Sequence, residues 1–179
     1  GAVTEVFLSR GEEGREASRC AQAAAFGAWG IPGDAQIAKT VLGKPYLAQY
    51  PGVQFNLSHS GPWGVCALSG APVGVDVELV RPLRQNVARR FFTAGEQAYL
   101  ERCPEREFFR LWTRKESFIK ALGKGLTLPL DCFSVLEDLM VWEGTAWYFH
   151  QFPVEEGYLT LCCQEPEAAF HRLDGEDPQ

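Results

Sequence analysis

The feature that most constrains this fold is a long helical pattern over residues 105–122. At 100° per residue, apolar side chains recur along one stripe of the predicted helix, and such a stripe is the core-facing side. The stripe consists of Phe108, Leu111, Trp112, Ile119 and Leu122. The opposite side is expected to face solvent, and it carries Arg106, Arg110, Arg114, Ser117 and Ala121.

Two charges break this amphipathic pattern. Lys115 points into the stripe between Trp112 and Ile119, and Glu116 lies along its edge. Desolvation of an ion costs several kcal/mol, so a charge is seldom buried without a partner. The simplest interpretation is a helix ion pair between Glu116 and Lys120, which contributes roughly 0.2–0.5 kcal/mol.

The predicted elements follow the order helix, strands, helices, strands, with a strand before the first helix and a seam near residues 80–92. This order predicts an α+β fold that is compatible with two similar halves. We expect an N-terminal half at residues 1–82, a C-terminal half at 83–172 and a disordered tail at 173–179. The expected helices are 11–29, 82–92, a short one ending near 104, and 105–122. The expected strands are 4–8, 37–42, 53–57, 63–68, 73–79, 132–136, 139–142, 145–151 and 158–163.

Three local signals mark the ends of these elements. Ser58–Pro62 is expected to turn the chain after the strand that precedes it. Ser69–Pro72 is typical of a hairpin between two strands. Thr93 and Glu96 have the T-x-x-E form of a capping box and predict the start of a short helix.

Composition and charge weigh against several classes of protein. The 179 residues are 46% hydrophobic and 22% charged, which is typical of a compact protein. A net charge of −6 disfavours a nucleic-acid binder. No apolar run approaches about 18 residues and no signal-peptide pattern opens the chain, so we expect a cytoplasmic protein without membrane contact. The 6 cysteines lack metal-site spacing and predict reduced structural thiols.

Asp76 and Glu78 lie on the same face of a predicted strand, because side chains at i and i+2 point the same way. One interpretation is a half-exposed strand with ordinary solvated acids. The other is half of a site for Mg²⁺, which proteins hold with a few carboxylates while waters and substrate phosphates complete the coordination.

A polar segment at residues 56–61 precedes these acids. Its hydroxyls, its imidazole and its glycine could donate hydrogen bonds to phosphate oxygens, with a turn-forming motif as the alternative. Lys44 and Lys120 could supply positive charge to the same ligand.

Several segments together resemble the 4′-phosphopantetheinyl transferases, and most closely the surfactin-synthetase-activating group. The runs Gly-Val-Asp-Val-Glu at 74–78 and Trp-Thr-Arg-Lys-Glu-Ser-Phe-Ile-Lys at 112–120 resemble the two signature motifs of that family. Further similar segments, in the same order and spacing, are 43–45, 56–60, 90–93 and 123–126.

The resemblance implies the family's fold, two pseudo-related α/β halves with the active site between them, and a monomer. It also implies the family's reaction, in which the 4′-phosphopantetheine of coenzyme A is transferred to a serine of an apo carrier protein and adenosine 3′,5′-bisphosphate is released. Carriers of fatty-acid, polyketide and nonribosomal-peptide synthesis all remain open as partners.

By motif match, Asp76, Glu78 and Glu116 would bind Mg²⁺ on the diphosphate of coenzyme A, where the metal neutralises charge on the leaving phosphate. Glu116, or a water that it orients, would take the proton from the carrier serine. Lys120 would contact the diphosphate.

Further contacts with coenzyme A are implied by the same match. Ser58 and His59 would reach its phosphate oxygens, and Lys44 would lie beside the adenine and ribose. Lys115 would bond to acids or phosphate. Arg19 is the first candidate for the 3′-phosphate, with a solvated side chain as the alternative.

Carrier recognition is implied for the segment after the first motif, where basic residues suit an acidic partner. The candidates are Arg84, Gln85, Arg89, Arg90 and Phe92. Two other classes remain open at this point. One is a Mg²⁺-dependent hydrolase of nucleotide or coenzyme A diphosphates, and the other is a non-catalytic module that binds coenzyme A or a carrier protein.

Overall fold

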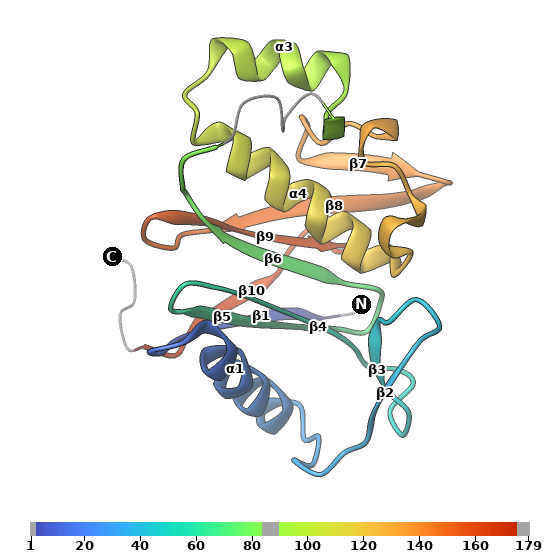
Figure 1. Cartoon of the computed structure of the whole chain (residues 1–179). Helices are drawn as coiled ribbons and strands as arrows, with labels where there is room; N and C mark the ends of the chain where they lie inside the picture. The colour runs from blue at the N-terminus through green and yellow to red at the C-terminus, as the bar shows by residue number, and fades with distance from the viewer. Residues whose placement is uncertain (1–2, 84–89, 175–179) are drawn as a thin grey trace.

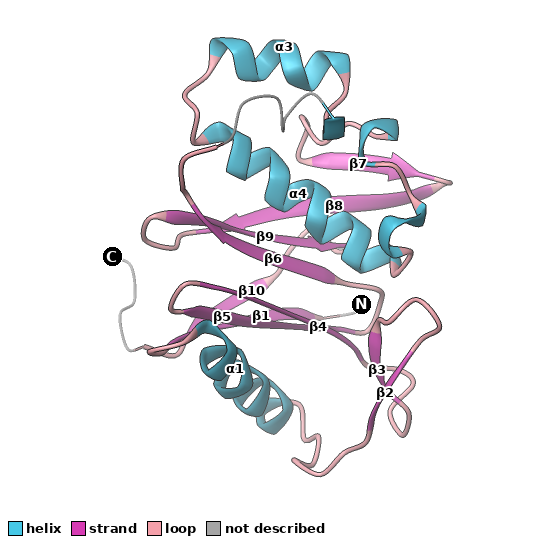
Figure 2. Ribbon diagram, viewed as in Figure 1, coloured by secondary structure: helices cyan, strands magenta, loops and turns pink. Residues whose placement is uncertain are grey.

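The computed structural model describes residues 3–83 and 90–174, and for Leu126 it describes the backbone alone. Within these residues, two four-stranded sheets pack face to face between two helical layers (Figures 1 and 2). A shared apolar core joins the inner faces of the two sheets, with Val6 and Val65 from one sheet and Val75, Val77 and Leu161 from the other.

The first sheet has the strand order β10-β1-β5-β4, and α1 covers its outer face. Small residues along α1, such as Ala21 and Ala25, allow the helix to lie close to the sheet. At Gly64 a Cβ would stand 2.0 Å from the backbone nitrogen of Ser18, so only glycine permits this contact. The elements are β1 (Thr4–Arg10), α1 (Gly14–Ala28), β4 (Gln54–Ser60), β5 (Trp63–Ser69) and β10 (Ala169–Arg172).

The second sheet has the order β6-β9-β8-β7, with α4 on its outer face and α3 beyond it. Its strands are β6 (Gly74–Leu79), β7 (Leu139–Trp142), β8 (Thr145–Phe152) and β9 (Gly157–Cys163). The helices are α3 (Ala94–Arg102) and α4 (Glu107–Leu122), followed by the 3₁₀ turns η1 (Gly125–Thr127) and η2 (Leu130–Cys132). A short hairpin of β2 (Ile37–Lys39) and β3 (Pro45–Leu47) stands beside both halves.

Each sheet contains strands from both sides of the expected boundary near residue 82. β6 precedes that boundary but pairs with β9, and β10 comes near the end of the chain but pairs in parallel with β1. Two residues of the expected tail also have partners, since Leu173 donates its backbone N–H to Leu8 and Asp174 accepts from Arg172. The remaining tail residues lie outside the described part of the chain.

The prediction that one side of α4 faces solvent is wrong. Arg114, Ser117 and Ala121 are buried, because this side lies on β6 and β9. A Cβ at Gly74 would meet the Ser117 carbonyl at 1.9 Å, so the helix and the strand are in direct backbone contact. The apolar stripe packs on the other side, and Phe108 contacts the buried ring of Phe92. The helix is therefore covered on both sides.

Two predicted turns are corrected by the structure. Ser58–Ser60 belongs to β4, and the chain turns only at Gly61 and Pro62. The hairpin expected at Ser69–Pro72 is absent from the described structure, since β5 and β6 lie in different sheets.

The strand expected at 132–136 is also absent from the described structure. In a strand, the backbone groups of Val135 would bond to a neighbouring strand. Here the Val135 N–H donates to the Glu96 carboxylate, and the Val135 carbonyl accepts from Arg114. The capping box at Thr93 and Glu96 is confirmed, and both of its hydrogen bonds are present. Much of the helix expected at 82–92 lies outside the described residues.

All 6 cysteines are free thiols, and three of them are buried. None of the helices in the described ranges has the length and apolar character needed to cross a membrane.

Candidate functional site

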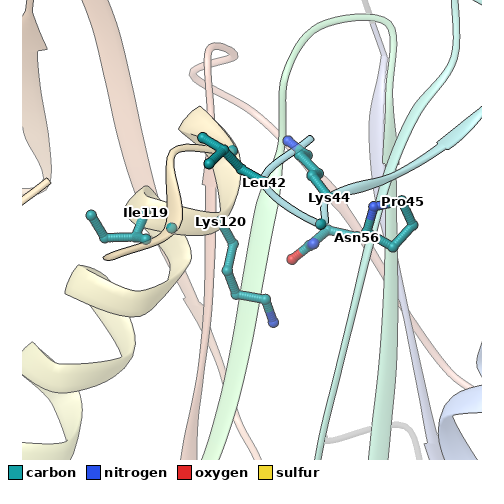
Figure 3. A pocket seen from close by; sticks show the side chains of 9 residues that line it. Leu42, Lys44, Pro45, Asn56, Ile119 and Lys120 are labelled. Atoms are coloured by element: carbon teal, nitrogen blue, oxygen red, sulfur yellow. The ribbon is translucent and has the colours of Figure 1, made fainter. Parts of the chain in front are cut away.

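A cleft lies where α4 meets β4 and the turn before β3. Its cavity of about 190 Å³ is open to solvent at one side, and an adjoining hollow of about 430 Å³ shares Leu42 and Lys44 with it. Figure 3 shows Lys120 projecting from α4, while Lys44 and Asn56 reach in from the N-terminal segments. The cleft therefore takes one wall from each half of the molecule.

Lys120 connects the two halves at this cleft. Its ammonium donates to the carbonyl of Leu57 on β4 and to that of Val75 on β6, each at 2.7 Å. Burial lowers the pKa of Lys120, and the nearby carboxylates of Asp76 and Glu116 oppose that change. The structure thus directs the amine to two backbone carbonyls rather than into the simple helix ion pair with Glu116.

Asp76 is buried on the α4 side of β6 with only half of its carboxylate bonded. Its Oδ1 accepts from the Ser58 hydroxyl at 3.3 Å, whereas its Oδ2 has no hydrogen-bond partner within the described residues. Burial raises the pKa of Asp76 well above its ordinary value; Lys120 counteracts this, and Glu78 and Glu116 add to it. An unpartnered buried carboxylate oxygen is costly in free energy, and it marks a position for a ligand or a cation.

Glu116 and Glu78 complete a group of mutually repelling acids. Burial raises the pKa of Glu116, Lys120 partly opposes this, and the charge of Glu78 raises it further. Glu78 is held by Arg81 through an ion pair of 2.9 Å. Arg81 was missed at the level of sequence, where its only signal was a cation three residues after an acid. The three predicted metal ligands are therefore near enough to influence one another's charge, and Glu78 is already paired with Arg81.

The acids of this group have the donor atoms of a Mg²⁺ site but not its spacing. Carboxylate oxygens are the donors that Mg²⁺ prefers, and the unpartnered Asp76 Oδ2 fits a cation. In residues 3–83 and 90–174, however, no three His, Cys, Asp or Glu side chains are placed closely enough to hold a metal ion. The donor chemistry fits Mg²⁺, and Glu78 would have to exchange Arg81 for the metal.

Lys44 contributes a second amine to the cleft. Its ammonium donates to the carbonyls of Ala121, at 3.0 Å, and Val73, at 3.4 Å. Burial lowers its pKa to about 8. Gly123 leaves room for the lysine stem, because a Cβ there would stand 3.0 Å from Lys44 Cδ, and the left-handed φ of 70° also favours glycine.

Ser58 and His59 point to opposite faces of β4, as successive strand residues must. Ser58 faces the second sheet and bonds to Asp76. His59 is exposed beside the first turn of α1, where a Cβ at Gly14 would lie 3.0 Å from the histidine Cβ. The structure therefore brings Ser58 to the acid cluster and places His59 at the α1 side.

Of the two kinds of partner predicted for Lys115, an acid or a phosphate, the structure shows the acid. Its side chain is 0% exposed, and its ammonium pairs with Glu96 at 2.7 Å and donates to the carbonyls of Leu130 and Phe133. A fully buried amine with these partners cannot reach a phosphate in the cleft. Glu96 was recognised as a helix cap, but nothing in the sequence linked it to Lys115.

The remaining candidates lie apart from the cavity. Arg19 is exposed on α1 and lines a separate depression beside Phe26 and Ile31. Phe92 is 2% exposed, so it cannot offer its ring to a carrier protein. Arg90 is exposed. The carrier-recognition candidates that lie outside the described residues are Arg84, Gln85 and Arg89.

A family model described as the 4′-phosphopantetheinyl transferase superfamily matches residues 72–163. This match covers just over half of the 179 residues and includes both the acid strand β6 and the helix α4. The chain belongs to the 4′-phosphopantetheinyl transferase superfamily. The α+β fold expected from the order of elements is confirmed with it.

Relatives within the superfamily agree with this assignment. The 4′-phosphopantetheinyl transferase Sfp of Bacillus subtilis is 37% identical over 146 residues, covering 75% of this chain and 65% of its own length. The 4′-phosphopantetheinyl transferase psf-1 of Bacillus pumilus is 48% identical over 141 residues, covering 72% and 60%. These similarities support the surfactin-synthetase-activating group. The chain thus spans less than two thirds of the length of these curated relatives.

Proposed function

We propose that this chain transfers the 4′-phosphopantetheine group of coenzyme A to a serine of an apo carrier protein, which yields the holo carrier and adenosine 3′,5′-bisphosphate. The observation that carries the proposal is the cleft cluster of Asp76, Glu78, Glu116 and Lys120. Three carboxylates surround one ammonium there, and a buried carboxylate oxygen is left without a partner in the described residues.

Each side chain of the cluster has a role that its environment supports. Glu116, or a water that it orients, is the proposed proton acceptor for the carrier serine; burial raises the pKa of Glu116, which favours a base, whereas binding of Mg²⁺ would lower it and favour the water. Lys120 would place its ammonium on the diphosphate, and its two carbonyl partners hold it ready to do so. Lys44 would contact the adenosine end of coenzyme A from the opposite wall of the cavity.

Mg²⁺ is proposed as the cofactor, held by Asp76, Glu78 and Glu116. When bound, it would supply charge neutralisation on the diphosphate. The orphaned Asp76 oxygen and the hard oxygen donors support this part of the proposal. The expectations that the protein is cytoplasmic and acts as a monomer stay predictions.

The test uses the full chain with coenzyme A, Mg²⁺ and a panel of apo carriers from fatty-acid, polyketide and nonribosomal-peptide synthesis. The intact mass of each carrier is measured over time. We expect a gain of one phosphopantetheine, and we expect Glu116→Gln to lower the initial rate by about 10²-fold or more, the contribution of a positioned general base. The matched control is Glu107→Gln, which changes a glutamate of the same helix that pairs with Arg110.

Two results would contradict the proposal. If no carrier gains mass, transfer is wrong. If adenosine 3′,5′-bisphosphate is released at the same rate without any carrier, the chain is a hydrolase of coenzyme A diphosphates instead.

A further inference from the structure

The strands β4 and β6 belong to different sheets but are joined by a regular row of hydrogen bonds from backbone to side chain. Alternate residues of β6 donate their backbone N–H groups to alternate side chains of β4. The bonds run from Val75 to Asn56 Oδ1 (2.9 Å), from Val77 to Ser58 Oγ (3.1 Å) and from Leu79 to Ser60 Oγ (3.2 Å). We call Asn56, Ser58 and Ser60 the seam ladder.

The seam ladder has a constant register. Each pair is separated by 19 residues, and successive pairs advance by two along both strands. The two strands therefore run in the same direction, with side chains in place of the backbone pairing of a parallel sheet. This explains why a polar residue occupies every second position of the β4 segment that the sequence first suggested as a phosphate binder.

Side chains also bind a carbonyl on this edge of β6 and the carbonyl of the residue just before the strand. Val75 accepts from Lys120, and Val73 accepts from Lys44. An unpaired strand edge inside a protein would leave several polar groups unsatisfied, at about 1–3 kcal/mol each. The edge that carries the acids is thus fixed by side chains that cross the boundary between the halves.

We infer that the seam ladder positions the acid strand for the reaction, with Ser60 as a positioning residue. Asp76 and Glu78 alternate with the residues that the ladder holds, and a slip of one residue would turn both acids to the apolar face between the sheets. The catalytic consequence of this inference rests on the proposed function. The geometry of the seam ladder depends on the hydrogen bonds alone.

Ser60 separates positioning from ligand contact better than the other two ladder residues. Ser58 bonds directly to Asp76, and Asn56 lines the cavity. Ser60 instead holds Leu79, the residue that follows Glu78. A change at Ser60 therefore acts on the acids through the backbone of β6.

The experiment compares Ser60→Thr, which keeps a hydroxyl, with Ser60→Val, which has the same shape without one. The control is Ser69→Ala, which removes a buried hydroxyl bonded to Thr4 in the same sheet. For each variant we would measure hydrogen exchange of the Leu79 amide, binding of Mn²⁺ as a probe in the presence of coenzyme A, and the initial rate of transfer with its dependence on Mg²⁺ concentration.

For Ser60→Val we expect the Leu79 amide to exchange about fivefold faster, the loss of one hydrogen bond. We also expect weaker Mn²⁺ binding and a higher Mg²⁺ concentration for half-maximal rate. Ser60→Thr should retain the parent values, and Ser69→Ala should lower stability without changing Mn²⁺ binding. Parent-like Mn²⁺ binding in Ser60→Val, or an equal loss in Ser69→Ala, would overturn the inference. A parent protein without transfer activity would contradict the proposed function instead. Hydrogen exchange of the Leu79 amide and Mn²⁺ binding would still test the role of the seam ladder.

Discussion

Two charge clusters begin at adjacent positions of α4, one fully buried and the other partly buried. Lys115 pairs with Glu96. The Lys115 ammonium also donates to two backbone carbonyls, and both Glu96 carboxylate oxygens accept from backbone N–H groups. One residue further along, Glu116 faces Lys120 and Asp76 in a cluster with surplus negative charge and an unpartnered oxygen in the described structure. The Lys115–Glu96 pair is fully buried, whereas Lys120 of the cleft cluster lines a cavity that is open to solvent.

This difference separates a structural role from a functional one. A buried ion pair with complete hydrogen bonding ties three segments together, here α3, α4 and the segment after η2. A cluster that repels itself lowers stability, and a protein retains it where a ligand supplies the missing charge. The two clusters are therefore expected to respond oppositely to mutation.

The largest effect is expected when the Lys115–Glu96 pair is broken. Glu96→Ala leaves the Lys115 ammonium buried without its counter-ion and removes one of the two hydrogen bonds of the α3 capping box, so we expect a loss of about 3–5 kcal/mol in the free energy of unfolding. Urea denaturation would measure it, with the exposed Glu101→Ala on the same helix as control. A loss below about 1 kcal/mol, the value of an exposed pair, would remove the distinction between the clusters.

A smaller effect is expected at Lys44, whose amine has carbonyl partners where Lys115 has a carboxylate. Its pKa of about 8 in the folded protein lies below the ordinary 10.5. Between these values the unfolded chain binds the proton more tightly, so this group makes stability rise with pH from about 8 to 10.5. Lys44→Met should flatten that rise in thermal unfolding measured across the range, and the exposed Lys39→Met should leave it unchanged. An unaltered slope in Lys44→Met would show that another group causes it.

The sequence predicted those parts of the site that depend on spacing along one element. Asp76 and Glu78 share a face of a strand, and Glu116 and Lys120 share a helix edge, so their relative positions follow from the periods of those elements. The capping box at Thr93 and Glu96 was predicted for the same reason, since both partners lie within one turn.

The predictions that failed concern contacts between segments that are distant in the sequence. Local periodicity placed Ser117 in solvent, but the missing side chain of Gly74 lets β6 cover it. Ser58 and Ser60 were expected in a turn or on a phosphate, because only the position of β6 shows what these side chains bind. Lys115 was left between an acid and a phosphate because its partner, Glu96, lies on another helix.

The most direct test of the account measures the stability of Asp76→Asn at pH 8 with and without coenzyme A and Mg²⁺. The folded protein holds the Asp76 proton more tightly than the unfolded chain, so this carboxyl lowers stability as pH rises above its ordinary pKa of 3.8. Asparagine removes that penalty. We predict that Asp76→Asn melts at a higher temperature than the parent without ligand, yet gains little from coenzyme A and Mg²⁺, which stabilise the parent. A variant that melts lower than the parent but is stabilised equally by the ligands would contradict the central claim that the cleft cluster is kept for binding rather than for the fold.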